Sequence, residues 1–103
     1  MIQIINRKRY DTKKAELIGL WNNGHCTGDA HYYSESLYVT IKGNFFIHKA
    51  GGALSDWAEK INNISSPFEK IIPINKEQAL DWLSRNNCPE VAEKYFHDLI
   101  EDA

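Results

Sequence analysis

The chain has 103 residues, of which 43% are hydrophobic, 12% aromatic and 25% charged, and its formal net charge is −2. This length and apolar content predict one folded domain over residues 1–103 and exclude an intrinsically disordered chain. No apolar run approaches the roughly 20 residues of a membrane span, and the start MIQIINRKRY lacks the order of a signal peptide. We therefore expect a cytoplasmic protein without a membrane partner. The two cysteines, Cys26 and Cys88, form no disulfide framework.

Charge is separated along the chain. Residues 1–14 carry five cations against the single carboxylate of Asp11, and residues 75–103 carry seven carboxylates against three cations. The N-terminal group could contact phosphates, because clustered cations create a local positive field, although a solvated hairpin tip has the same composition. Its members are Arg7, Lys8, Arg9, Lys13 and Lys14.

The first elements in chain order are short strands. Three isoleucines in residues 2–5, followed by the polar stretch 6–9 and Tyr10, predict a strand that turns into a second segment. Residues 15–21 are apolar, and Gly19 with its β-branched and aromatic neighbours favours a third strand, although residues 12–16 alone could start a helix. The loop of residues 22–30 follows and is a candidate recognition surface.

Residues 31–53 are predicted to form the central hairpin, with a turn at Lys42-Gly43-Asn44. Apolar side chains fall on one face of its first strand at period two, and polar ones fall on the other. We therefore expect one buried and one solvated face. The apolar face holds Tyr33, Leu37, Val39 and Ile41, and the polar face holds Tyr32, Ser34, Ser36, Thr40 and Lys42.

The remaining elements are mostly helical. Residues 54–61 have the spacing of a short amphipathic helix, and residues 69–74 predict a strand in which Pro73 favours an edge position. Asn75 and Gln78 have the form of a capping box, so a helix is expected near 76–86. Pro89 suits the first position of a second helix, near 89–101. The pattern predicts an α+β fold: an antiparallel sheet of four or five strands with two C-terminal helices on one face.

Several residue groups have both a chemical and a structural interpretation. His25, Cys26, Asp29 and His31 could ligate a metal or support Cys–His chemistry, but no second ligand cluster completes a zinc site, so a polar loop without metal or catalytic residue is expected. The tryptophans Trp21, Trp57 and Trp82 are expected in the core. Five aromatic residues could form a base-stacking platform or ordinary cross-strand pairs: Tyr32, Tyr33, Tyr38, Phe45 and Phe46.

Three stretches carry a resemblance to a known family: residues 9–19 (RYDTKKAELIG), 32–58 (YYSESLYVTIKGNFFIHKAGGALSDWA) and 69–83 (EKIIPINKEQALDWL). Their Tyr-Tyr-x-Glu-x-Leu-Tyr core, Lys-Gly-Asn turn, Gly-Gly bend and Ile-Ile-Pro strand resemble small proteins carried by bacterial plasmids and phages. That family overlaps with anti-CRISPR proteins, which block RNA-guided effector nucleases. The resemblance covers roughly half the chain and transfers no catalytic or binding residue.

The resemblance implies a non-enzymatic inhibitor whose partner is an RNA-guided nuclease complex or its guide RNA, without a cofactor. By charge, either the N-terminal cations would contact RNA or four acidic residues would enter a basic groove of the nuclease: Glu93, Asp98, Glu101 and Asp102. The alternatives are a small nucleic-acid-binding regulator of a mobile element, a protein-interaction module, and an enzyme that uses His25, Cys26 or His31.

Overall fold

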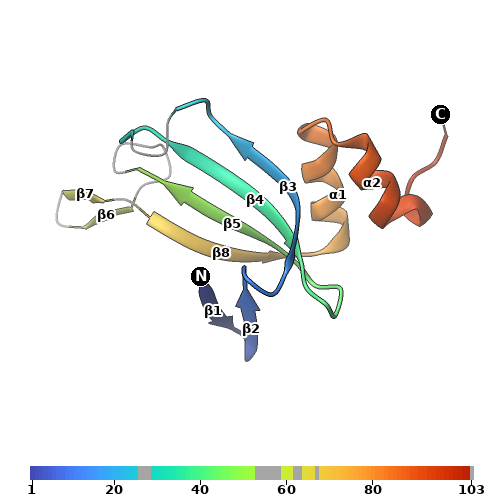
Figure 1. The fold of residues 1–103 in the computed structure, drawn as a ribbon, viewed down its shortest axis with the longest axis horizontal. Coiled ribbons are helices and arrows are strands. Elements are labelled where there is room, and N and C mark those ends of the chain that lie inside the picture. The colour runs from blue at the N-terminus through green and yellow to red at the C-terminus, as the bar shows by residue number, and fades with distance from the viewer. Residues whose placement is uncertain (26–28, 53–58, 62–63, 67, 103) are drawn as a thin grey trace.

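The computed structural model describes residues 1–25, 29–52, 59–61, 64–66 and 68–102, and of 59–61 and 64–66 it describes the backbone alone. These residues form an α+β fold, as predicted: a two-stranded N-terminal hairpin, a four-stranded antiparallel sheet and two C-terminal helices (Figure 1). A second two-stranded hairpin is inserted before the last strand of the sheet. None of the helices in the described part of the chain is long and apolar enough to cross a membrane.

The four-stranded sheet has the order β3-β4-β5-β8. Its two middle strands are the predicted central hairpin, and β8 lies at an edge, where the missing N–H of Pro73 is tolerated. The strands are β3 (Glu16–Asn22), β4 (Tyr33–Val39), β5 (Phe45–Gly51) and β8 (Phe68–Ile74).

The N-terminal hairpin consists of β1 (Ile2–Ile5) and β2 (Lys8–Asp11). Its two turn residues, Asn6 and Arg7, have φ values of 50° and 66°. Two consecutive positive φ angles suit a two-residue hairpin, because the twist of such a turn matches that of the flanking strands. The predicted hairpin is confirmed, but its turn has two residues and not the four expected, because Lys8 and Arg9 already belong to β2.

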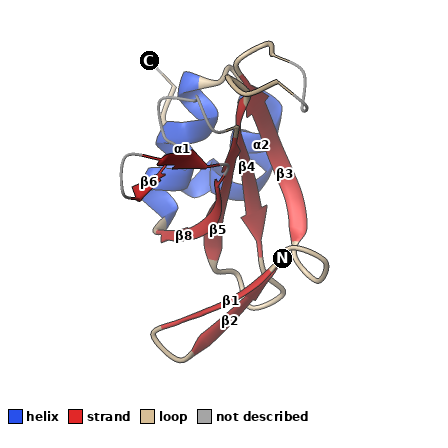
Figure 2. Ribbon diagram, turned by 90° about the vertical axis from the view of Figure 1, so that its left-hand side faces the viewer, coloured by secondary structure: helices blue, strands red, loops and turns tan. Residues whose placement is uncertain are grey.

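One face of the sheet is covered by α1 (Lys76–Arg85) and α2 (Pro89–Phe96), which lie on the same side of it (Figure 2). The predicted capping box starts α1: Asn75 Oδ1 accepts from Gln78 N at 2.8 Å, and Gln78 Oε1 accepts from Asn75 N at 2.9 Å. The core between the two layers contains Ile18, Leu37, Val39, Phe45, Ile47, Ala79, Trp82, Leu83, Ala92 and Phe96.

The opposite face of the sheet was expected to be solvated, and this expectation is wrong. Phe46 is fully buried there, with Tyr38 stacked on it at 5.1 Å between ring centroids and Tyr10 packed edge-on at 5.4 Å. Ser34 and Ser36 are buried as well. The N-terminal hairpin supplies this second layer, which a pattern within β4 alone could not reveal.

Two apolar residues expected in the core are exposed. Ile41 lies beyond the end of β4, in the turn before β5, and 94% of its surface is exposed. Trp21, on the edge strand β3, is 40% exposed, whereas Trp82 is buried as predicted. Trp57 lies outside the described residues.

Two predicted helices also differ from the structure. A helix was expected at 54–61, but residues 59–61 form the strand β6 (Glu59–Ile61), which pairs with β7 (Ile64–Ser66). Residues 53–58 are not described. The second C-terminal helix stops at Phe96 and continues as a 3-10 turn, η1 (His97–Leu99). Leu99 and Ile100 were expected on its buried face and are 46% and 40% exposed.

A polar contact fixes α1 on the sheet. Glu35 of β4 accepts hydrogen bonds through both carboxylate oxygens, from Trp82 Nε1 at 2.9 Å and from the Tyr33 hydroxyl at 2.6 Å. Burial raises the pKa of Tyr33, and the neighbouring Glu35 carboxylate raises it further. The Trp82 indole packs directly on the backbone of Gly19, since an added Cβ there would lie 2.5 Å from Trp82 Cζ3.

Replacing Gly19 by alanine should therefore destabilise the protein. We expect the collision with Trp82 to lower the free energy of unfolding by roughly 1–3 kcal/mol, which exceeds the gain of about 0.5–1 kcal/mol from a less flexible backbone. Urea unfolding followed by tryptophan fluorescence measures this. Leu20→Ala, at a neighbouring exposed position, is the control and should stay within about 0.5 kcal/mol of the parent. An unchanged midpoint for Gly19→Ala would contradict this account of the Trp82 packing.

Tyr33 should make stability depend on alkaline pH. Its pKa is raised in the folded state, so its contribution is fully present below the unfolded pKa of about 10 and is lost as pH rises above that value. Between pH 9 and pH 11 the stability difference between the parent and Tyr33→Phe should shrink by about 1.4 kcal/mol. Urea unfolding of both proteins at the two pH values tests this, and a constant difference would show that Tyr33 does not resist ionisation.

Candidate functional site

The loop before β4 brings two histidines and an aspartate together. His25 Nδ1 lies 3.4 Å from Asp29 Oδ2, His31 N donates to Asp29 Oδ1 at 2.8 Å, and the two imidazole centroids are 5.8 Å apart. The backbone hydrogen bond from His31 and the contact with His25 lower the pKa of Asp29. Within the described ranges no three side chains are placed to hold a metal ion. Cys26 lies outside those ranges, and the remaining contacts are those of a polar surface loop.

A second histidine contact lies on β5, where no role was predicted. His48 Nε2 is 2.6 Å from Glu69 Oε1 on β8, and Ser36 of β4 is the cross-strand neighbour of His48. These three residue types could form a hydrolytic triad. In the described part of the chain, however, no hydrogen bond joins Ser36 to His48. The contact between His48 and Glu69 therefore connects β5 and β8, and it does not include Ser36.

Of the two interpretations of the aromatic residues, the structure shows cross-strand packing, since Tyr38 of β4 is the cross-strand neighbour of Phe46 of β5 and stacks on it. Tyr33 and Phe45 are only 5% and 6% exposed, and Phe46 is fully buried. Phe45 packs against Phe96 of α2, with 5.0 Å between ring centroids. Because these rings are used for core packing, they present no face on which a base could stack.

The candidate functional site is a groove of about 430 Å³, lined by charged side chains, between the N-terminal hairpin and the turn that joins β4 to β5. We call it the basic groove. It brings together parts of the chain that are about thirty residues apart, and its lining contains five cations and one carboxylate. The lining residues are Arg7, Lys8, Arg9, Tyr10, Asp11, Lys14, Ala15, Thr40, Ile41, Lys42 and Asn44.

The five cations of the basic groove are free to bind an anion. All five side chains are exposed, and within the described part of the chain none of them is in an ion pair. The one carboxylate of the groove, Asp11, is 9% exposed and accepts a hydrogen bond from Lys13 N at 2.9 Å. With five cations against this one carboxylate, the lining keeps an excess of positive charge.

Backbone hydrogen bonds hold both walls of the groove in place. On one side Thr12 N donates to Met1 O at 3.1 Å, and Asp11 O accepts from Lys14 N and Ala15 N at 3.2 and 3.1 Å. On the other side Thr40 N donates to Asn44 O at 2.8 Å. Lys14 and Lys42 are thus presented on short, closed turns, whereas Lys8 and Arg9 lie on β2.

The predicted RNA-contacting residues are largely brought together. Four of the five line the basic groove, and Lys13 does not. Lys42 was missed as a member of this group, because its approach to the N-terminal hairpin depends on a long-range contact. Its place in a turn with a neighbouring glycine was the one available signal that the side chain would be exposed.

The predicted acidic residues occupy another part of the molecule. Glu93 lies on α2, Asp98 in η1, and Glu101 and Asp102 follow them, and all four are exposed. The chain end that carries them lies away from the N-terminal hairpin in both views (Figures 1 and 2). Glu93 lines a cleft of about 460 Å³ between the helices.

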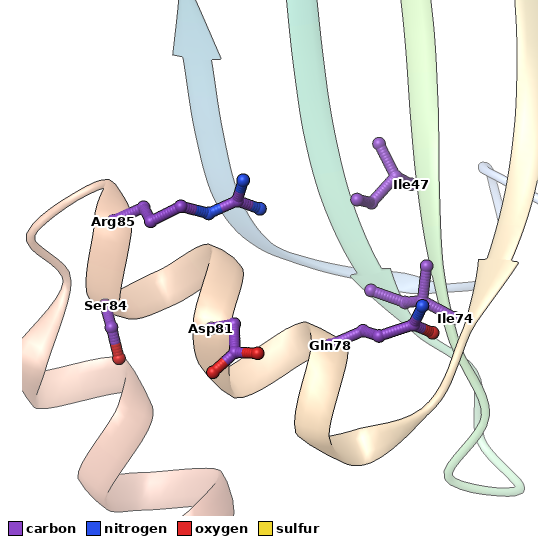
Figure 3. A pocket seen from close by; sticks show the side chains of 6 residues that line it. All are labelled: Ile47, Ile74, Gln78, Asp81, Ser84 and Arg85. Carbon is purple, nitrogen blue, oxygen red and sulfur yellow. The ribbon is translucent and has the colours of Figure 1, made fainter.

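A further pocket, of about 500 Å³, lies between α1 and the strands β5 and β8. Arg85 and Gln78 extend from α1 toward the sheet, where Ile47 and Ile74 face them (Figure 3). Its lining contains one cation and one carboxylate, that of Asp81. This balanced lining shows no preference for a charged ligand.

No protein-family model, curated protein or solved structure matches this chain. The resemblance of residues 9–19, 32–58 and 69–83 to plasmid and phage proteins stays a prediction.

Proposed function

We propose that this protein is a non-enzymatic RNA-binding protein that holds the phosphate backbone in the basic groove. The observation that supports this is the set of five exposed cations, free of ion pairs among the described residues, that two hairpins place around one groove. Phosphate contacts by lysine and arginine supply most of the affinity of sequence-independent nucleic-acid binding.

The separation of charge supports the same proposal. The net charge of −2 would repel RNA if the charges were evenly distributed. Here five of the twelve lysine and arginine residues line the groove, and the acidic residues of α2 and the C-terminal end lie elsewhere. A bipolar molecule of this kind is oriented by the field of an RNA, so that the basic groove meets the phosphates first.

The target that we propose is the guide RNA of an RNA-guided effector nuclease in the cytoplasm. The resemblance of three stretches of the chain to a family that overlaps with anti-CRISPR proteins supports this choice. Such nucleases hold their guide by its backbone in a positively charged channel. A protein that covers the guide backbone would compete with that channel and block assembly of the complex. The alternative, a regulator that binds nucleic acid of a mobile element, would use the same groove.

The first test is salt-dependent RNA binding. We expect the parent protein to bind a 20-nucleotide RNA with an affinity that falls between 50 and 200 mM salt. In Arg7→Ala/Lys8→Ala/Arg9→Ala the slope of log K against log salt should decrease by about 2, since each lost phosphate contact removes roughly 0.7 for a single strand. Fluorescence anisotropy measures both quantities.

A matched control removes the same charge elsewhere. Lys70→Ala/Lys76→Ala/Lys94→Ala deletes three exposed cations that do not line the basic groove. This variant should keep the parental salt slope. Equal losses in the two triple variants would show that the net charge, and not the groove, determines binding.

The second test separates the two targets. The protein is added to an RNA-guided nuclease before or after the guide RNA is loaded, and cleavage of DNA is measured. Inhibition only when it is added first, and its loss in the groove triple variant, are the expected results. Inhibition that survives in that variant would implicate the acidic residues Glu93, Asp98, Glu101 and Asp102. RNA binding without any inhibition would support the mobile-element regulator instead.

A further inference from the structure

The basic groove contains one residue that phosphate binding does not explain. Ile41 lines the groove, and 94% of its surface is exposed, the highest value among the exposed large hydrophobic residues of the described chain. Isoleucine is among the residues most often buried, because exposing it forfeits the transfer free energy of its side chain. An exposed isoleucine surrounded by cations therefore points to a ligand with both apolar and anionic parts.

The turn that carries Ile41 has a defined shape. Asn44 N donates to Thr40 Oγ1 at 3.0 Å, Gly43 N donates to Thr40 O at 2.9 Å, and the φ of Gly43 is +83°. A positive φ at this position suits glycine. Ile41 therefore sits on a closed turn, so little conformational entropy is lost when a ligand packs against it.

The surroundings of Ile41 match the two faces of a nucleotide. Lys42 follows it in the turn, and Arg7, Lys8 and Arg9 lie in the opposite wall of the groove. A nucleotide combines an anionic phosphate with an apolar base face in a similarly small space. In a duplex the base faces are stacked on one another, whereas in an unpaired strand they are available for contact.

We infer that the basic groove takes an unpaired nucleic-acid strand, and that Ile41 packs against a base that leaves the stack. This inference rests on the proposed RNA binding and adds a preference for single strands over duplexes. The groove volume of about 430 Å³ agrees with it, since it lies in the range of roughly 300–1,000 Å³ typical of small-ligand clefts. One or two nucleotides can enter such a space, while a duplex can touch only its rim.

The experiment compares a 12-nucleotide unstructured RNA with an RNA duplex of the same sequence, using fluorescence anisotropy at one salt concentration. Ile41→Ser should weaken binding of the single strand about 10-fold, because it removes the apolar packing on the base, and leave binding of the duplex unchanged. Ile41→Phe should strengthen binding of the single strand, because an aromatic ring stacks on a base. Leu20→Ser is the matched control: Leu20 is 60% exposed on β3, does not line the groove and should change neither affinity.

The possible failures are distinguishable. Equal affinity of single strand and duplex, with no effect of Ile41→Ser, would overturn the inference and leave salt-dependent backbone binding standing. Failure of the parent to bind either RNA would overturn the proposed function and this inference together. Binding to phosphatidylserine vesicles that needs Ile41, without a preference for single strands, would overturn the inference in favour of a lipid surface.

Discussion

The packing of Tyr10 on Phe46 is the contact on which the basic groove depends. Phe46 projects from the sheet on the side away from the helices, and Tyr10 of β2 meets its ring edge-on at 5.4 Å. Tyr10 is only 6% exposed, and together with Phe46 and Ile71 it forms a small second core. Because β2 also carries Lys8 and Arg9, this core sets the distance between the N-terminal cations and the turn after β4. An apolar contact thus positions a polar surface.

The same arrangement explains why the net charge describes this molecule poorly. A chain with a charge of −2 contains a groove with five cations and one largely buried carboxylate. Exposed charges more than a Debye length apart, about 8 Å at physiological ionic strength, are largely screened from one another. A ligand in the groove therefore experiences the local cations, and the acidic residues on α2 affect its orientation more than its affinity.

The sequence predicted the elements whose cause is local. The capping box of Asn75 and Gln78 and the first-turn position of Pro89 act within a few residues, and both are confirmed. The misses come from contacts between distant segments. Whether the side of the sheet that carries Tyr38 and Phe46 faces water depends on Tyr10, which lies 28 residues before Tyr38 in the chain. Ile41 has another cause: it fits the apolar period of β4, but β4 ends at Val39, so Ile41 lies in the turn that follows. The periodicity at 54–61 spans too few residues to distinguish a helix from short strands.

The candidate site was predictable to the same extent as the fold. Runs of cations are visible in any sequence, so Arg7, Lys8, Arg9 and Lys14 could be named as a group. That Lys42 and Ile41 belong to the same groove depends on the second core, in which Tyr10 of the N-terminal hairpin packs on Phe46 of β5. The lining combines the five cations and Asp11 with polar and apolar groups, which are those of Tyr10, Ala15, Thr40, Ile41 and Asn44. For the RNA-binding function that we propose, binding in this groove is enough to keep the strand from a competing partner.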